Sequence, residues 1–426
     1  MTMEDKITSV RAQQIIDCKC RPAVEVEIRT ESGAVGRGAA PTGTSVGMHE
    51  AFILRDGDRS SYNGLSVHKA VEYAVDIIGP ALVGMNVFDQ RAIDMRMITL
   101  DGTPDKHNLG GNTIYSASIA AFRAAADSRR MPLYRHIASR DIRTVPVPCF
   151  NIVNGGRYET LTQAFNEFLI VPYGTDSIDF AVEMAVTVFQ KLAEVLTKHL
   201  GHKPQVASSY GYAAPSDDPE VILALMQGAI DACGYTGRIA FALDCASSEM
   251  YNKEARTYLL KGKQVTSDEL IAYAKSLTEK FNMVFIEDLL DENDWDGYSK
   301  AVRELTRTIV LGDDLTVTSP ALLKRAHETR AVDGFILKPN QVGTITEAMD
   351  AHRFASEHGM FSVPSGRSGG MVDDVVMDFS VGLEVPFQKN GAPRSGERIE
   401  KLNFLMRANA ASPGCRLYDI KPLLRF

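Results

Sequence analysis

Four short apolar runs in the second half of the chain decide its fold: RIAFALD (238–244), MVFIED (283–288), TIVLGDD (308–314) and GFILKP (334–339). Each run ends on or beside a charged residue. Glu287, Asp313 and Lys338 follow one another at intervals of 26 and 25 residues, about the length of one strand, one helix and two loops. This is the period of a (β/α) barrel, whose strands bring their C-terminal ends to one mouth. The sequence therefore predicts an α/β fold with functional side chains at that mouth.

The side chains at these strand ends suggest a metal beside a base. Asp244, Glu287 and Asp313 offer carboxylate oxygens, which are the ligands that Mg²⁺ prefers. The charge of a bound metal would lower the pKa of a neighbouring ammonium group, so Lys338 is a candidate general base. One charged strand end often only caps a helix or forms an ion pair, but four in barrel order favour an active site.

The pattern before residue 139 differs from the pattern after it. PAVEVEIRT (22–30) alternates between apolar and polar residues, as an antiparallel strand does, and residues 113–128 follow a helical period. We expect an N-terminal α+β domain at 1–138 and a barrel at 145–426.

Composition excludes several classes of partner. The chain of 426 residues has a net charge of −8, so a general nucleic-acid or anionic-membrane surface is not expected. Its six cysteines match no zinc spacing. No run of 18 apolar residues occurs and the first residues lack a signal-peptide pattern, so a cytoplasmic location is expected.

Longer motifs make the chain resemble the enolases along nearly its whole length: VPVPCFNIVNGG (145–156), LDENDWDGY (290–298), LKPNQVGT (337–344) and GAPRSGERIEKLN (391–403). The resemblance implies an N-terminal capping domain and a modified (β/α)8 barrel. It also implies Mg²⁺-assisted removal of the proton beside a substrate carboxylate, with one or two Mg²⁺ ions per site, and a homodimer.

The resemblance assigns roles to individual residues. It makes Asp244, Glu287 and Asp313 the Mg²⁺ ligands and Lys338 the base. It implies further roles at the mouth: Ser45 for a second Mg²⁺, Glu167 as a retained acidic residue, Lys389 for the substrate carboxylate, and Arg367 and Ser368 for its phosphate.

The departures from the enolase pattern fall on one side of the reaction. Where enolases read GDEGG, this chain reads ASSYG, with Ser209 at the position of the catalytic acid. Where enolases read GGEH, it has Arg157 and Tyr158, and Gly366 replaces the histidine of SHRSG. A positioned acid typically contributes ~10²–10⁴-fold to rate, so dehydration of 2-phosphoglycerate should be severely slowed.

These substitutions suggest altered chemistry on a retained three-carbon acid of the 2-phosphoglycerate or phosphoenolpyruvate type. Arg157, Tyr158 and Ser209 remove negative charge and add donors, which suits another anionic group. The chain is similar in this respect to enolase-like enzymes of the carboxyphosphonoenolpyruvate synthase type, from phosphonate and phosphinate antibiotic pathways. Those enzymes join a phosphonoformyl group, carried as its cytidylyl anhydride, to an enolpyruvate unit.

Two other functions remain open. A phosphopyruvate hydratase would use Glu159, Glu167 or a metal-bound water in place of the lost acid. A non-catalytic enolase-like scaffold would not need Mg²⁺ at all.

Overall fold

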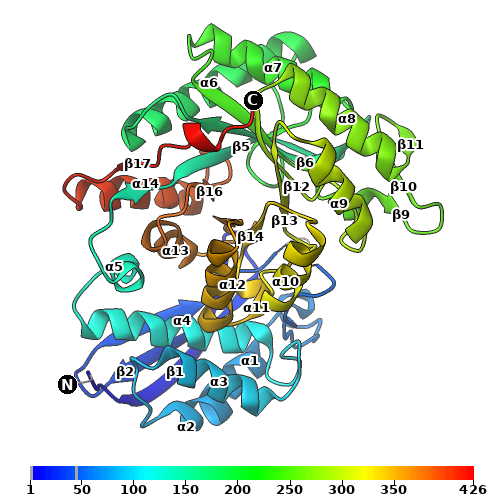
Figure 1. Cartoon of the computed structure of the whole chain (residues 1–426). Helices are drawn as coiled ribbons and strands as arrows, with labels where there is room; N and C mark the ends of the chain where they lie inside the picture. The colour runs from blue at the N-terminus through cyan, green and yellow to red at the C-terminus, as the bar shows by residue number, and fades with distance from the viewer. Residues whose placement is uncertain (1–2, 44–46) are drawn as a thin grey trace.

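The structure, a computed structural model, describes residues 3–43 and 47–426. Its N-terminal elements form an antiparallel sheet in the order β1-β2-β3, with helices packed on one face (Figure 1). The elements are β1 (Ile7–Ile16), β2 (Pro22–Thr30), β3 (Val35–Ala39), α1 (His68–Tyr73), α2 (Gly79–Leu82), α3 (Gln90–Asp101), α4 (Gly111–Ser128) and α5 (Leu133–Ala138), with short helices η1 (Tyr62–Gly64) and η2 (Ala74–Ile78).

Alternation along β2 explains how this sheet is covered. Val24, Val26 and Ile28 are buried and belong to one apolar core with the small residues of α4. Gly38 on β3 allows the close approach, because a Cβ there would lie 2.2 Å from the Ser116 carbonyl oxygen on α4. The small residues of α4 therefore serve helix–sheet packing.

The main sheet has the path β15-β14-β13-β12-β8-β6-β5-β16. Its strands are β5 (Val147–Arg157), β6 (Thr162–Pro172), β8 (Ile239–Asp244), β12 (Met283–Glu287), β13 (Ile309–Gly312), β14 (Gly334–Leu337), β15 (Phe361–Pro364) and β16 (Phe387–Lys389). β6 pairs antiparallel with β5 and β8, whereas the other neighbours along the path are parallel. A single parallel bridge between Ser365 and Lys389 links the two ends of the path.

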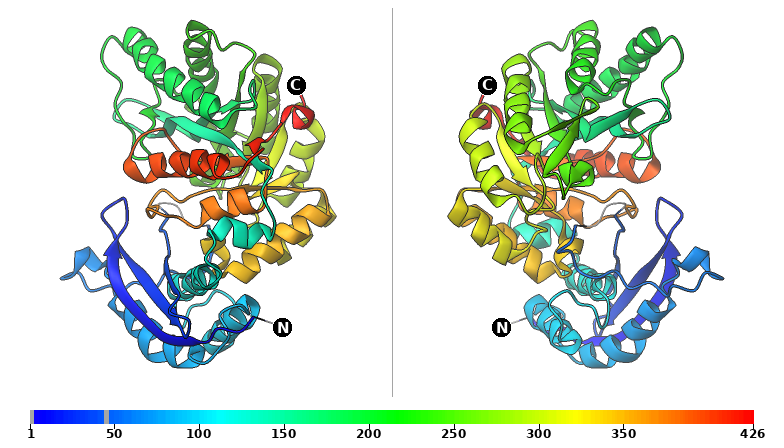
Figure 2. Two further views of the ribbon diagram at one scale, coloured as in Figure 1. Left: turned by 90° about the vertical axis from the view of Figure 1, so that its left-hand side faces the viewer. Right: turned by 90° about the vertical axis from the view of Figure 1, so that its right-hand side faces the viewer.

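Helices surround this sheet on the outside (Figures 1 and 2). They are α6 (Ile178–Leu200), α7 (Pro219–Ala232), α8 (Ser267–Lys280), α9 (Trp295–Glu304), α10 (Pro320–Thr329), α11 (Pro339–Val342), α12 (Ile345–Glu357), α13 (Val376–Gly382) and α14 (Gly396–Ala410). Short elements complete the chain: β4 (Thr144–Val145), β7 (Tyr212–Ala213), η3 (Ser247–Met250), β9 (Tyr251–Asn252), β10 (Thr257–Leu260), β11 (Lys263–Val265), β17 (Arg416–Leu417) and η4 (Lys421–Leu423).

Alternate residues of one strand enter two different cores. On β8, Ala240 and Ala242 belong to the core that the strands enclose, while Phe241 and Leu243 pack outward against the helices. A strand buried on both faces reads as a continuous apolar run, which is the pattern in the sequence. The predicted α/β architecture with an N-terminal α+β part is confirmed.

The β1–β2 turn reaches from the N-terminal sheet to the main sheet (Figure 2). The Cys18 amide donates to the Gly370 carbonyl oxygen at 3.2 Å, and the Cys18 thiol donates to the Ser368 carbonyl oxygen at 3.3 Å. N-terminal residues therefore contact the loop that follows β15. Among the described helices, none has the length and apolar character needed to span a bilayer.

Candidate active site

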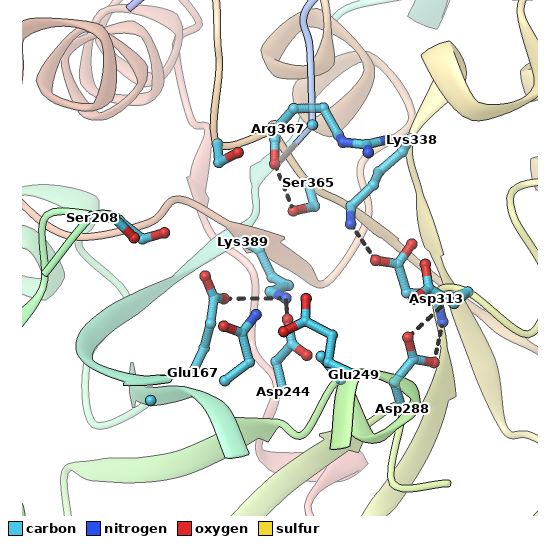
Figure 3. Close-up of a pocket in the computed structure, with 18 of the residues that line it drawn as sticks. Glu167, Ser208, Asp244, Glu249, Asp288, Asp313, Lys338, Ser365, Arg367 and Lys389 are labelled. Atoms are coloured by element: carbon cyan, nitrogen blue, oxygen red, sulfur yellow. Dashed lines mark hydrogen bonds and ion pairs between the residues drawn. The ribbon is translucent and has the colours of Figure 1, made fainter. Parts of the chain in front are cut away.

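A cavity of about 310 Å³ opens at the C-terminal ends of the main-sheet strands (Figure 3). Asp244, Asp313, Lys338 and Lys389 line it, from the ends of β8, β13, β14 and β16. Charged and small polar side chains make up most of its wall. This is the mouth at which the strand-end residues are expected to meet.

Strand register brings three carboxylates side by side. Asp244 on β8 pairs with Glu167 on β6 and with Glu287 on β12. The Lys389 ammonium lies among the three, 2.9 Å from Asp244 Oδ2, 2.5 Å from Glu287 Oε2 and 3.4 Å from Glu167 Oε2. Because adjacent like charges repel, this shared cation is what lets the three acids sit at one level of the sheet.

The pKa values of this group follow from burial and charge. Burial raises the pKa of Glu287 well above its usual range, and the neighbouring Asp244 raises it further. Burial alone would lower the pKa of Lys389, but Asp244, Glu287 and Glu167 raise it well above its ordinary value. Lys389 is therefore a permanent cation in this structure.

The hydrogen bonding of Glu287 leaves one carboxylate oxygen available for a metal ion. Its Oε1 atom is buried and accepts no hydrogen bond from any described residue. A buried carboxylate oxygen without a donor is costly, and a hard cation with oxygen ligands would satisfy it. Asp244, beside it, has the matching chemistry.

Lys338 pairs with Asp313 on the other side of the cavity. Its ammonium contacts Asp313 Oδ2, while Gln341 Nε2 donates to Asp313 Oδ1 at 2.8 Å. Burial lowers the pKa of Lys338, but the Asp313 and Glu287 carboxylates raise it, and the net pKa is raised. In this state Lys338 holds its proton, so a base role requires Asp313 to be engaged elsewhere.

A second acidic group overlaps the first at Asp313. Carboxylate oxygens of Asp288, Asp313 and Asp314 lie within 4.8 Å of one another. Asp288 accepts hydrogen bonds from the backbone amides of Asp313 at 2.8 Å and Asp314 at 3.0 Å, which fixes the loop after β13. Burial and the Asp313 charge raise the pKa of Asp288 to about 7. Burial raises the pKa of Asp314 to about 9, with further contributions from the charges of Asp288 and Asp313. This acidic cluster could also hold a cation.

Arg367 is held by a residue from the N-terminal part of the chain. Its guanidinium makes two bonds to Glu50, at 2.8 Å to Oε2 and 3.2 Å to Oε1, and both side chains are buried. Glu50 Oε1 also accepts from the Gly47 amide at 3.0 Å. Ser368 lines the cavity beside Arg367, and Ser45 lies outside the described residues.

The residues that depart from the enolase pattern differ in whether they line the cavity. Ser209 lines the cavity, and its carbonyl oxygen accepts a bond from Arg398. The Tyr158 hydroxyl donates to the Asn154 carbonyl oxygen at 2.6 Å, and the exposed Arg157 places a guanidinium nitrogen 3.7 Å from the Met250 sulfur. Arg157 and Tyr158 are not among the described residues that line the cavity. Their role in substrate binding stays a prediction.

Sequence reasoning missed several groups at this site. Glu249 lines the cavity from η3, where burial and the charge of Asp244 raise its pKa. Asn151 donates to Glu167 Oε1 at 2.6 Å from the neighbouring strand. Asn151 lies inside the motif at 145–156 and Glu249 lies outside the quoted motifs, and no spacing rule singles out either residue. Glu50 could only be found from its contact with Arg367.

Comparison with known families assigns both parts of the chain. The model described as "Enolase, N-terminal domain" matches residues 7–137, and "Enolase, C-terminal TIM barrel domain" matches residues 142–417. The chain belongs to the enolase family. The predicted membership of the enolase superfamily is confirmed, and the strand-end carboxylates and lysines belong to an enolase-type barrel.

Proposed function

We propose that this enolase-family protein is a Mg²⁺-dependent enzyme that forms an enolpyruvyl ester of phosphonoformate, as carboxyphosphonoenolpyruvate synthases do. The observation that carries the proposal is an imbalance within one cavity. The deprotonating side has Lys338, Lys389 and a set of buried carboxylates in place. At the position of the enolase acid, the cavity wall is Ser209.

In the proposed reaction the chain's own groups divide the work. Asp244, Glu287 and Asp313 would hold Mg²⁺, which supplies Lewis-acid stabilisation of the substrate carboxylate. Lys389 would neutralise that carboxylate. Lys338 would accept the C2 proton when 2-phosphoglycerate is bound, whereas phosphoenolpyruvate has no proton there. Arg367, whose guanidinium ends bond Glu50, would give up one of these bonds to contact a phosphate, with Ser368 next to it.

The proposed chemistry does not need the lost acid. In ester formation from phosphoenolpyruvate, the enolpyruvate oxygen would form a bond to the phosphonoformyl phosphorus as the bond from that phosphorus to cytidylate breaks, and the phosphoryl group would pass to water. Cytidylate and inorganic phosphate would leave. Hydroxide is a poor leaving group unless it receives a proton, whereas these anions depart with less help. An enzyme that has lost the acid and kept the enolate-stabilising groups is therefore suited to substitution at phosphorus.

A phosphopyruvate hydratase with a substituted acid remains the second candidate, because Glu167 and Glu249 are among the carboxylates that line the cavity. Glu167 lies 3.4 Å from Lys389, and the exposed Glu249 also lines the cavity. Glu159, by contrast, is exposed and is not among the described residues that line the cavity.

A phosphorus NMR time course separates the two functions. The protein with Mg²⁺ is incubated with 2-phosphoglycerate or phosphoenolpyruvate, with and without cytidylyl phosphonoformate. A new phosphonate ester signal that requires the nucleotide donor is the expected result. Rapid interconversion of the first two compounds alone would contradict the proposal and establish a hydratase.

A further inference from the structure

A small second cavity of about 50 Å³ adjoins the main one on the side of Ser209. It shares part of its wall with the main cavity, including Glu167, Ser209 and Lys389, and continues to Asn390, Gly391, Arg398 and Lys401. One buried water needs about 10–15 Å³ by such a measure, so the space fits a group of carboxylate size.

Four cationic side chains line this space: Arg367, Lys389, Arg398 and Lys401. All four are buried. The single carboxylate among the lining residues is Glu167, which already accepts a bond from Asn151 and contacts Lys389. Buried cations that face a cavity favour an anionic occupant.

The acids that partner Arg398 and Lys401 lie behind the wall. Lys401 contacts Glu397 Oε1, and Arg398 Nε lies 3.8 Å from Glu397 Oε2. Asp374 is the other acid near Lys401; burial raises the pKa of Asp374 and the Lys401 charge lowers it. Arg398 and Lys401 line the cavity, whereas Glu397 and Asp374 are not among the described residues that line it.

Gly366 leaves the room for this arrangement. A Cβ at position 366 would lie 2.2 Å from Lys401 Nζ. The lysine ammonium thus occupies the space in which a side chain at this position would begin. Where enolases place a histidine, this chain has a glycine and a cation behind it.

Two cations also hold the segment that replaces the enolase acid. Arg398 donates to the Ser209 carbonyl oxygen, and Lys19 donates to the Ser208 carbonyl oxygen. The Lys19 ammonium is 4.5 Å and the Arg398 guanidinium 4.8 Å from the centre of the Tyr210 ring. Cations near an aromatic ring are stabilised by its π-electrons, so this segment is electropositive where enolases carry a carboxylate.

We infer that the cavity of Arg398, Lys401 and Gly366 is a subsite for the anionic group of a second substrate, on the far side of the wall that it shares with Arg367 and Ser368. The inference rests on the proposed function, and it names the ligand class as a small carboxylate or phosphonate dianion. The subsite places this group next to Lys389, within reach of the three-carbon acid in the main cavity.

Binding of two probes tests the subsite without turnover. Free phosphonoformate and 2-phosphoglycerate are titrated by calorimetry, each alone and each in the presence of the other, with Mg²⁺. Wild-type protein should bind both at once. Arg398→Gln should weaken phosphonoformate binding by at least about tenfold and 2-phosphoglycerate binding by less than about threefold, and Arg398→Lys should recover part of the loss.

Two further variants complete the test, one as a second probe of the subsite and one as a control. Gly366→Ala removes no charge, but its Cβ displaces the Lys401 ammonium, and it should also weaken phosphonoformate selectively. Arg394→Gln removes a guanidinium that stacks on Phe189 and Tyr212 outside both cavities, and it should leave both affinities unchanged. If Arg398→Gln does not fold, Gly366→Ala still decides the question.

The outcomes separate the subsite from the function. One-for-one displacement of phosphonoformate by 2-phosphoglycerate, or full affinity in both Arg398→Gln and Gly366→Ala, would overturn the subsite even if the ester product forms. Simultaneous binding that depends on Arg398, with no ester product from the nucleotide donor, would uphold the subsite and overturn the proposed function.

Discussion

Lys338 and Lys389 are both buried beside carboxylates, but their partners differ. Lys389 is shared by Glu167, Asp244 and Glu287, whereas Lys338 contacts Asp313 alone among the acids. A group with one dominant partner changes its proton affinity most when that partner is taken up by a ligand. Lys338 is therefore the better candidate for the base, and Lys389 for a fixed charge.

Replacing Lys338 tests this assignment. Lys338→Ala should lower turnover by about 10²–10⁴-fold or more, because among the described lysines only Lys338 forms an ion pair with Asp313, while thermal unfolding should remain a single cooperative transition. Lys324→Ala, an exposed lysine on α10, serves as the matched control with full activity. Activity of the Lys338 variant within about tenfold of wild type would remove it from the role of base.

Two overlapping acid sets are candidates for the proposed Mg²⁺ site. Asp313 belongs to both, so its variant cannot distinguish them. Glu287→Gln should weaken Mg²⁺ binding by at least about tenfold, because it removes a ligand and leaves Oε1 without a partner. Asp314→Asn should change the affinity little. Calorimetric titration of Mg²⁺ checks both.

If Asp314→Asn weakens Mg²⁺ binding and Glu287→Gln does not, the proposed metal site would instead consist of Asp288, Asp313 and Asp314. Asp333→Asn is the control, because this carboxylate pairs with Arg425 away from the cavity. An unchanged titration in Glu287→Gln and in Asp313→Asn together would mean that neither set holds the ion.

At the scale of elements, one buried carboxylate joins three helices. Asp94 on α3 accepts bonds from the Ser118 hydroxyl on α4 at 2.6 Å and from the Thr346 amide in the first turn of α12 at 2.9 Å. The N-terminal helices are thereby tied to a barrel helix at its positive end. Burial nevertheless raises the pKa of Asp94 from 3.8 to about 6.

This shift predicts how stability depends on pH. The folded protein binds the Asp94 proton more tightly than the unfolded chain, so the contribution is complete below pH 3.8 and is lost as pH rises through about 6. The loss amounts to about 3 kcal/mol. Asp94→Asn cannot titrate, and its urea unfolding free energy should fall less than that of wild type over this range.

The control replaces Asp76, an exposed residue of η2. Asp76→Asn should keep the wild-type dependence of unfolding free energy on pH. Parallel profiles for wild type and Asp94→Asn would show that Asp94 does not carry the effect.

Elements far apart in sequence also build the active site. Glu50 precedes the barrel by about a hundred residues of chain, yet it binds Arg367 after β15. The β1–β2 turn contributes Lys19 and Cys18, which contact the backbone of Ser208 and Ser368. Loops from the N-terminal part therefore contact Arg367 and the segment that contains Ser209. The carboxylates and lysines of the candidate site lie at the ends of barrel strands.

For the whole molecule, the sequence determined what depends on local periodicity. Apolar runs identify β8, β12, β13 and β14, and their spacing predicts that the charged ends meet at one mouth. The long motifs predict the enolase family. These features were accessible because strand period, helix length and strand-end position repeat along the chain without reference to distant contacts.

Only the tertiary structure decided which charges pair and which residues line the cavities. It placed Lys389 among three carboxylates, Glu50 on Arg367, and the Lys401 ammonium beside Gly366. It also separated Ser209, which lines the cavity, from Tyr158, whose hydroxyl turns back to the strand. Such choices depend on side-chain packing between segments remote in sequence, where electrostatics and burial act over a few ångströms that no spacing rule encodes.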